Sequence, residues 1–309
     1  MRLLGALICL LAFSGSVLDA QTSRKPKDDP SQIGKRDVGK GLNLYSIEKE
    51  IALGKQLAQE VQRQAKVVDD PLTSEFVNRL GQNLARNSDA RVPFTFKVIE
   101  GNSPNAFALP GGYVFVYTGL LKIASEEDEL AAALAHEIAH VAARHMTRQA
   151  TKSQVAGALG LPVSILLGGG WSSVLARQGL DAGLSAAFMK FTREDEAEAD
   201  YLGLQYLYAA GYDPNGAVSI FEKLASLERK QPGTVARIFS THPTDSARIQ
   251  NAEREIESIL PSRGEYVVNS SEYVAIRQRV IDGVATKRPT PGAAGDPDNA
   301  GVGRQDRME

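Results

Sequence analysis

Residues 130–140 have the sequence Leu-Ala-Ala-Ala-Leu-Ala-His-Glu-Ile-Ala-His, and this stretch decides the fold. It predicts a helix that opens at Ser125, an N-cap residue, with four carboxylates at 126–129 near the positive end of the helix dipole. The many alanines keep the helix thin, as expected of a helix packed among other elements. Two histidines buried in such a helix need partners, and one metal ion would satisfy both.

The two histidines, His136 and His140, are four residues apart. On an α-helix this spacing separates them by about 40°, so both imidazoles reach one ion. Glu137 lies about 100° from His136, beside the pair, where a carboxylate serves as general base toward a metal-bound water. The spacing therefore predicts a metal-dependent hydrolase.

Composition limits what else the chain offers. The 309 residues are 43% hydrophobic with a formal net charge of −2, which supports a real core and gives no basic field for nucleic acid. A single cysteine excludes a disulfide framework and a cysteine-based zinc cluster. Any metal must therefore be held by carboxylates and by some of the four histidines: His136, His140, His145 and His242.

A third metal ligand is expected from the acidic run at residues 194–200, where five of seven residues are carboxylates. One interpretation is a solvated acidic helix face. However, Glu196 and Asp200 share a face, and the apolar residues among and after them predict a helix that is at least partly buried. His145 lies about 180° from His136 on a continuous helix and is interpreted as a packing or capping residue.

The ends of the chain predict segments outside the fold. Residues 1–20 have one positive charge, an apolar run and a small residue at the end, as in a secretory signal peptide. An uncleaved amphipathic anchor is the alternative. Residues 21–41 are expected to form a flexible leader and residues 285–309 a disordered tail. The foldable domain is then 42–284.

An uncharged segment, 153–176, is long enough for a membrane span. Five glycines, four serines and Pro162 interrupt it, which favours a glycine-hinged pair of short apolar elements near the active site. A re-entrant or membrane-touching element remains an alternative, so membrane contact through 153–176 is kept as a hypothesis.

Periodicity predicts a mainly α (α+β) fold, with a small sheet beside the histidine-bearing helix. The expected strands are 93–99 and 113–117. The expected helices are 46–67, 72–84, 126–148, 184–210, 214–230 and 243–259.

Several of these motifs occur in an order that resembles metallopeptidase family forty-eight, which includes the HtpX-like bacterial proteases and the CAAX prenyl endopeptidases. The resemblance covers about residues 44–260. It rests on His136-Glu137-Ile138-Ala139-His140-Val141 with Arg144-His145, on Arg193 before Glu196-Ala197-Glu198-Ala199-Asp200, on Gly211-Tyr212-Asp213-Pro214, and on Thr241-His242-Pro243 with Arg248-Ile249.

The resemblance implies a zincin-like gluzincin domain with one Zn(II) per chain, bound by His136, His140 and Glu196. It also implies that Asp200 orients a ligand histidine through its free ring N–H. Glu198 is a weaker alternative ligand, because it lies about 200° from Glu196 on a helix. His242 is implied to contact the site, either donating to the oxyanion or binding the open metal position.

The implied function is a zinc metalloendopeptidase that cleaves unfolded or extended polypeptides of the cell envelope, after export to the periplasm. Residues 105–112 and the strand after them resemble the family's substrate-facing edge, and we expect the peptide to add as a strand near 113–117. The alternative is a latent protease that acts mainly as a chaperone or assembly factor, with 153–176 or His242 closing the site. A structural zinc protein is disfavoured, since structural sites rarely place a glutamate between two such histidines.

Overall fold

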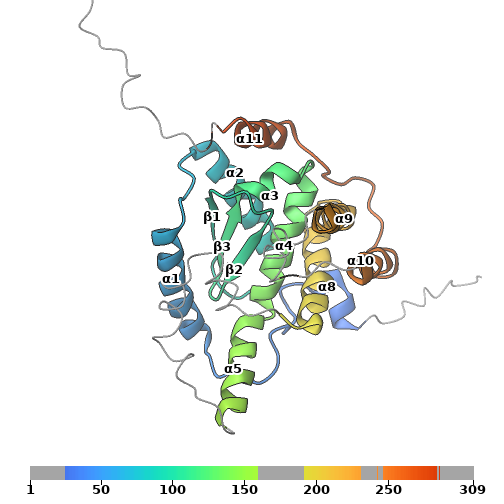
Figure 1. Cartoon of the computed structure of the whole chain (residues 1–309). Coiled ribbons are helices and arrows are strands. Elements are labelled where there is room, and N and C mark those ends of the chain that lie inside the picture. The colour runs from blue at the N-terminus through green and yellow to red at the C-terminus, as the bar shows by residue number, and fades with distance from the viewer. Residues whose placement is uncertain (1–24, 159–190, 231–241, 243–245, 284, 286–309) are drawn as a thin grey trace, which may run out of the picture.

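A buried helix, α4 (Glu127–Ala142), lies between a small sheet and a second buried helix, α8 (Arg193–Ala209) (Figure 1). This arrangement is taken from a computed structural model that describes residues 25–158, 191–230, 242, 246–283 and 285. The predicted mainly helical fold with a small sheet beside the histidine-bearing helix is confirmed.

The sheet has three strands in the order β1-β3-β2: β1 (Thr95–Ile99), β2 (Ala106–Leu109) and β3 (Tyr113–Tyr117). The central strand β3 is parallel to β1 and antiparallel to β2. The expectation that a peptide adds along 113–117 is therefore wrong, because both edges of β3 are already paired. Strand β2, which periodicity did not predict, carries the sheet edge that faces α4.

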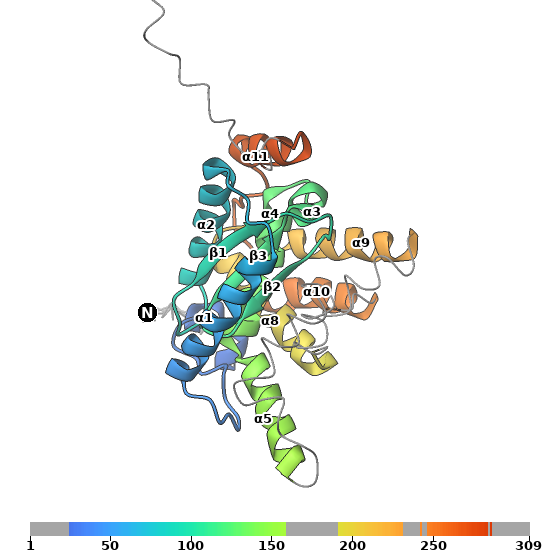
Figure 2. The ribbon, with the colours of Figure 1, turned by 60° about the vertical axis from the view of Figure 1, so that its left-hand side comes forward.

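Alternate residues of the strands pack on opposite faces of the sheet. One face packs against α1 (Ile47–Gln64), through Phe107, Phe115 and Tyr117. The other face packs against α2 (Pro71–Arg86) and α4. The layers are thus α1, sheet, α4 and α8, as both ribbon views show (Figures 1 and 2).

The remaining helices surround these layers. They are α3 (Thr118–Ile123), α5 (His145–Ala158), α9 (Asn215–Lys230), α10 (Ser246–Ile259) and α11 (Ser271–Ile281). The start of α11 is capped by Ser270, whose side chain accepts a hydrogen bond from the backbone N–H of Tyr273.

The helix expected over 126–148 is in fact two helices, α4 and α5. Arg144 separates them with a φ of 59°, a left-handed conformation that a non-glycine residue adopts only when its surroundings hold it. The Arg144 side chain donates to Glu50 at 2.8 Å and to the backbone carbonyl of Tyr45. These tertiary contacts, which periodicity does not register, accompany the end of α4 at Ala142, two residues after His140.

Helix α8 approaches α4 closely at a glycine. A Cβ atom added at Gly203 would lie 3.2 Å from both the N and the Cα of His136, tighter than ordinary packing. The missing side chain lets the backbone of α8 lie against His136. Glu196 and Asp200, on the preceding turns of α8, are thereby held beside the histidines.

Residues 25–41 differ from the expected flexible leader. Two short 3-10 helices, η1 (Pro26–Asp28) and η2 (Pro30–Gln32), lead to a buried ion pair between Arg36 and Asp89 at 2.5 Å. The charged composition of this segment suggested that it is solvated, but the charge of Arg36 is buried and paired with Asp89.

Other expectations fall outside the described residues: the signal peptide 1–20, most of 153–176 and nearly all of the tail 285–309. The domain boundaries therefore stay a prediction. Within the part of the chain that is described, no helix combines the length and apolar character that a bilayer crossing needs.

Candidate metal centre

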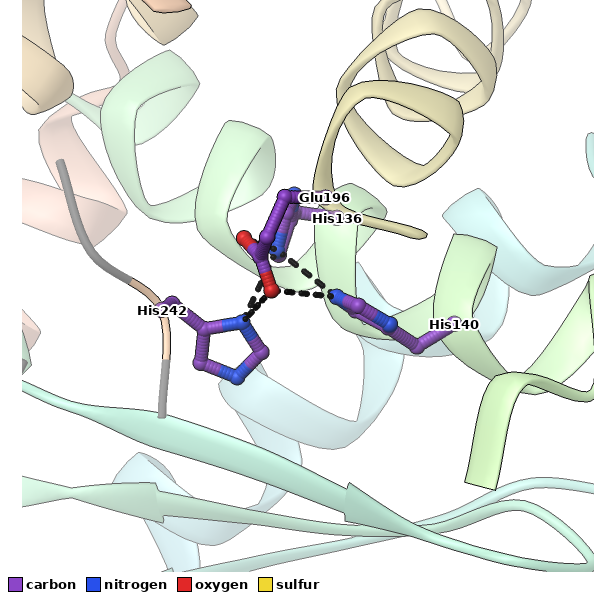
Figure 3. A group of neighbouring side chains, drawn as sticks. All are labelled: His136, His140, Glu196 and His242. Atoms are coloured by element: carbon purple, nitrogen blue, oxygen red, sulfur yellow. Dashed lines mark hydrogen bonds and ion pairs between the residues drawn. The ribbon is translucent and has the colours of Figure 1, made fainter. Parts of the chain in front are cut away.

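Four side chains from distant parts of the sequence converge at one point (Figure 3). His136 and His140 come from α4, Glu196 comes from the first turn of α8, and His242 precedes α10. One nitrogen or oxygen atom from each lies within 4.8 Å of the corresponding atoms of the others. We call these four residues the metal cluster.

The contacts inside the metal cluster are close. The Nε2 atoms of His136 and His140 are 3.0 Å apart, and Nδ1 of His242 is 3.3 Å from Nε2 of His136. Glu196 Oε1 lies 2.8 Å from Nδ1 of His242 and 3.5 Å from Nε2 of His140. Three imidazole nitrogens and a carboxylate therefore face a common centre.

This donor set fits a metal ion. His136, His140 and Glu196 are each at most 6% exposed, so water does not solvate them freely. The buried Glu196 Oε2 forms no hydrogen bond of good geometry within the described ranges, and its nearest charged neighbours are Arg248 Nη1 at 3.3 Å and His136 Nε2 at 3.4 Å. Nitrogen and carboxylate ligands without cysteine are those of a catalytic zinc site.

Asp200 lies between His136 and Arg248. Asp200 Oδ1 is 2.9 Å from Nδ1 of His136, a position from which the carboxylate could orient the ring. Burial raises the pKa of Asp200, but the adjacent Arg248 outweighs burial and holds it below its usual value. Burial lowers the pKa of His136, whereas Asp200 and Glu196 raise it more strongly, to about 9.

Glu137 lies next to the metal cluster and faces β2. Its Oε1 is 3.5 Å from Nε2 of His242, and its carboxylate lies near the backbone N–H of Ala108 on the sheet edge. Burial raises the pKa of Glu137, which makes its carboxylate a stronger proton acceptor, as a general base must be, although the Ala108 N–H lowers this pKa slightly.

Two cavities flank this edge. One is lined by Asn105 and Ala106 together with Glu137, His242 and Phe221. The other is lined by Ala108, Leu109, Pro110, His140 and Phe191. The outer edge of β2 therefore passes from one cavity, whose wall includes Glu137, to the other.

His145 does not join the metal cluster, as predicted, but its position differs from the one expected on a continuous helix. The break at Arg144 brings its Nδ1 to 2.9 Å from Nδ1 of His140. Glu198, the alternative ligand considered from the sequence, contacts His145 at 3.0 Å and lies outside the metal cluster.

Comparison with known proteins agrees with this geometry. The model of peptidase family M48 matches residues 71–256, which include the whole metal cluster. The chain belongs to peptidase family M48. The resemblance drawn from the ordered motifs is thereby confirmed.

Similar M48 proteins are longer than this chain. The beta-barrel assembly-enhancing protease of Yersinia pestis is 31% identical over 262 residues, which are 82% of this chain and 52% of that protein. Its namesake from Escherichia coli (strain K12) is 31% identical over 237 residues, 74% and 47% of the two chains. The mitochondrial metalloendopeptidase OMA1 of Schizosaccharomyces pombe is 36% identical over 192 residues, 61% and 53% respectively. The chain spans about half the length of these relatives.

Sequence reasoning missed two contributors to this M48 site. Arg248 was noted in a motif without a role, although an arginine six residues after a site histidine is a signal that could have identified it. Phe191 stacks on His140 with ring centroids 4.1 Å apart, but an aromatic residue two positions before Arg193 gives no signal in the sequence.

Proposed function

We propose that this chain is a zinc-dependent endopeptidase in which His136, His140 and Glu196 hold the metal. The observation that supports this most strongly is the metal cluster itself, buried beside Glu137 at a sheet edge. Bound zinc would polarise a scissile carbonyl and lower the pKa of a water molecule. Family membership supports the reaction class, and the nitrogen and carboxylate donors support zinc.

Glu137 is the proposed general base. Its carboxylate accepts the proton of the attacking water and returns it to the amine nitrogen that leaves. The carboxylate lies near the Ala108 N–H at the edge of β2, and burial raises the pKa of Glu137 toward the range that a base needs. Asp200 acts through His136 as a positioning residue, with Arg248 bound to both of its carboxylate oxygens.

The outer edge of β2 is the proposed peptide-binding site. An extended polypeptide adding as a strand there would lie across Glu137, with side chains entering the two flanking cavities. Main-chain pairing makes few demands on side chains, so broad specificity toward unfolded polypeptide is expected.

His242 is proposed to occupy the fourth position of the resting metal site. Its distances to Glu196 and His136 place Nδ1 inside the metal cluster, while its Nε2 faces Glu137. If the His242 side chain moved out of the metal cluster, this position would open. The imidazole would then lie near the reacting carbonyl and could donate a hydrogen bond to the oxyanion. A mainly chaperone function is less favoured, since the relatives are named as proteases.

We place the protein in the bacterial periplasm, with envelope proteins as substrates. The signal-like residues 1–20 support export, and the named role of the Escherichia coli relative in β-barrel assembly supports an envelope location. Division of the chain into 1–20, 21–41, 42–284 and 285–309 is part of this proposal, with 21–41 as a leader that packs on the domain through the Arg36–Asp89 ion pair. Membrane contact through 153–176 is also part of it.

The test is metal-dependent proteolysis by the purified chain. Metal content should be close to one zinc per chain, and unfolded casein should be cleaved. A chelator should abolish cleavage and added zinc should restore it. Cleavage that persists after complete zinc removal would contradict the proposal.

A further inference from the structure

A second histidine lies behind His140, on the side away from the metal cluster. His145 is fully buried, and its two ring nitrogens have different neighbours. Nδ1 is 2.9 Å from Nδ1 of His140, and Nε2 is 3.0 Å from Oε2 of Glu198. The residues at 140, 145 and 198 therefore form a chain of contacts leading outward from the metal cluster.

When His145 is neutral, the positions of the hydrogen atoms in this chain of contacts follow from its outer end. A carboxylate only accepts hydrogen bonds, so the contact with Glu198 requires a hydrogen on Nε2 of His145. A neutral His145 then presents the lone pair of Nδ1 to His140. His140 must carry its hydrogen on Nδ1, which leaves the lone pair of its Nε2 directed into the metal cluster. That tautomer is the one that binds a metal through Nε2.

The fold fixes this chain at both ends. The left-handed backbone of Arg144 turns α5 so that His145 faces back toward His140. Arg148 Nη1 lies 3.1 Å from Glu198 Oε2 and 3.2 Å from the carbonyl oxygen of Ala143, so it ties the carboxylate to the end of α4. The Glu198 side chain is 39% exposed, so the chain of contacts that begins at the metal cluster and passes through the buried His145 ends at the protein surface.

The ring of His140 is also restrained on its face. Phe191 stacks on it at a centroid distance of 4.1 Å and an interplanar angle of 25°. With one face covered and Nδ1 bonded, the imidazole has little freedom to turn its Nε2 away from Glu196.

From these contacts we infer that His145 and Glu198 are positioning residues that hold His140 in its metal-binding tautomer and orientation. The inference rests on the proposed binding of zinc by His140. It adds, on the opposite side of the metal cluster from the Asp200–His136 pair, a support made of a second histidine and a carboxylate.

The first test compares zinc affinities of full-length variants by competition with a chromogenic chelator. His145→Leu and Glu198→Leu should bind zinc about 10- to 100-fold more weakly than the wild type. Glu198→Gln should stay close to the wild type, because the amide oxygen still accepts from His145. Glu194→Leu is the matched control on the same helix, since Glu194 is exposed and lies outside the chain of contacts.

A conservative replacement separates positioning from packing. In His145→Gln the amide oxygen can accept from Nδ1 of His140, and the amide NH₂ can donate to Glu198. We expect His145→Gln to recover most of the zinc affinity lost in His145→Leu, although leucine fills the buried space equally well. If leucine and glutamine weaken zinc binding equally, the role is packing and the inference is wrong.

The tautomer can be observed without metal or activity. Long-range ¹H–¹⁵N spectra of histidine-labelled apoprotein, with only four histidines to assign, should show His140 protonated at Nδ1. Glu198→Leu should shift that signal toward a tautomer mixture, and this variant keeps the inference testable if His145→Leu does not fold. An unchanged tautomer and unchanged affinity in Glu198→Leu would overturn the inference. Absence of zinc binding by the wild type would instead overturn the proposed function.

Discussion

Asp200 contacts His136 and Arg248 at once, so one carboxylate joins the metal cluster to helix α10. Its Oδ1 lies 2.9 Å from Nδ1 of His136, and Arg248 donates to both carboxylate oxygens, at 2.6 and 2.7 Å. The arginine helps to keep the carboxylate ionised, and we propose that the carboxylate directs the ring of His136. This pair couples the position of α10, which follows His242, to the orientation of a proposed ligand.

Replacing Asp200 with asparagine should weaken zinc binding about 10-fold or more. The amide oxygen can still accept from Nδ1 of His136, but the negative charge is gone and Arg248 loses its ion pair with residue 200, keeping its 3.3 Å contact with Glu196. Equilibrium competition with a chelator measures the effect. Glu253→Gln, an exposed carboxylate on α10, should leave affinity unchanged. Equal affinities for both variants would show that Asp200 does not support the metal site.

Replacing Ala108 with proline should remove an N–H near the Glu137 carboxylate and block strand addition at β2 while the sheet persists. Proline is tolerated at sheet edges, and Ala108 directs its N–H away from β3. Casein cleavage should fall about 10²-fold with zinc content unchanged. If cleavage stays near the wild-type rate while circular dichroism shows an intact fold, β2 is not the peptide-binding edge.

Replacing Arg36 with methionine should destabilise the fold by about 3–5 kcal/mol, because Asp89 is left buried without its ion-pair partner. The Asp89 carboxylate would keep hydrogen bonds from Tyr206 and the backbone of Gly34. Urea denaturation measures the change in the free energy of unfolding. Joint replacement of both partners, with Asp89→Leu, should recover part of it. A loss below about 1 kcal/mol would mean that the predicted flexible leader describes this segment better.

Replacing Asp128 with asparagine should stabilise the protein at alkaline pH. Burial, together with the nearby charges of Glu129 and Asp213, raises the pKa of Asp128 to about 7, and its Oδ1 has no hydrogen-bond partner within the described residues. The folded state therefore binds a proton that the unfolded state has released, and stability contributed by Asp128 falls as pH rises from about 4 to 7.

The measurement for Asp128→Asn is thermal denaturation at two pH values. The melting temperature should rise by roughly 2–4 °C at pH 8 and by less at pH 5, where the wild-type carboxyl is already protonated in the folded protein. An equal shift at both pH values would show that charge burial at Asp128 is not the cause.

The sequence predicted most of the metal cluster because local helix geometry determines it. Spacing alone placed His136, Glu137 and His140, while the assignments of Glu196, Asp200 and His242 came from the resemblance to the M48 family. All six lie at one site in the structure. The positions of these residues depend on which faces of α4 and α8 pack together, and the helical periodicity of the sequence predicts which residues share a face.

What sequence reasoning missed depends on contacts between distant segments. Arg144 adopts its left-handed conformation because Glu50 and Tyr45 hold its side chain, so the break in the predicted helix has no local signal. The four-residue strand β2 is too short for clear alternation, and its position at the edge depends on pairing with β3. The buried ion pair of Arg36 was missed because its partner, Asp89, lies far along the chain.

The most direct test of the central claim is the Glu137→Gln variant, measured beside the wild type for zinc content and for cleavage of unfolded casein. Glu137 contacts the edge of β2 and His242 and lies outside the metal cluster, so the amide should leave the metal in place. The account predicts about one zinc per chain in both proteins and no detectable cleavage by the variant. Cleavage near the wild-type rate, with zinc bound, would contradict the assignment of Glu137 as general base.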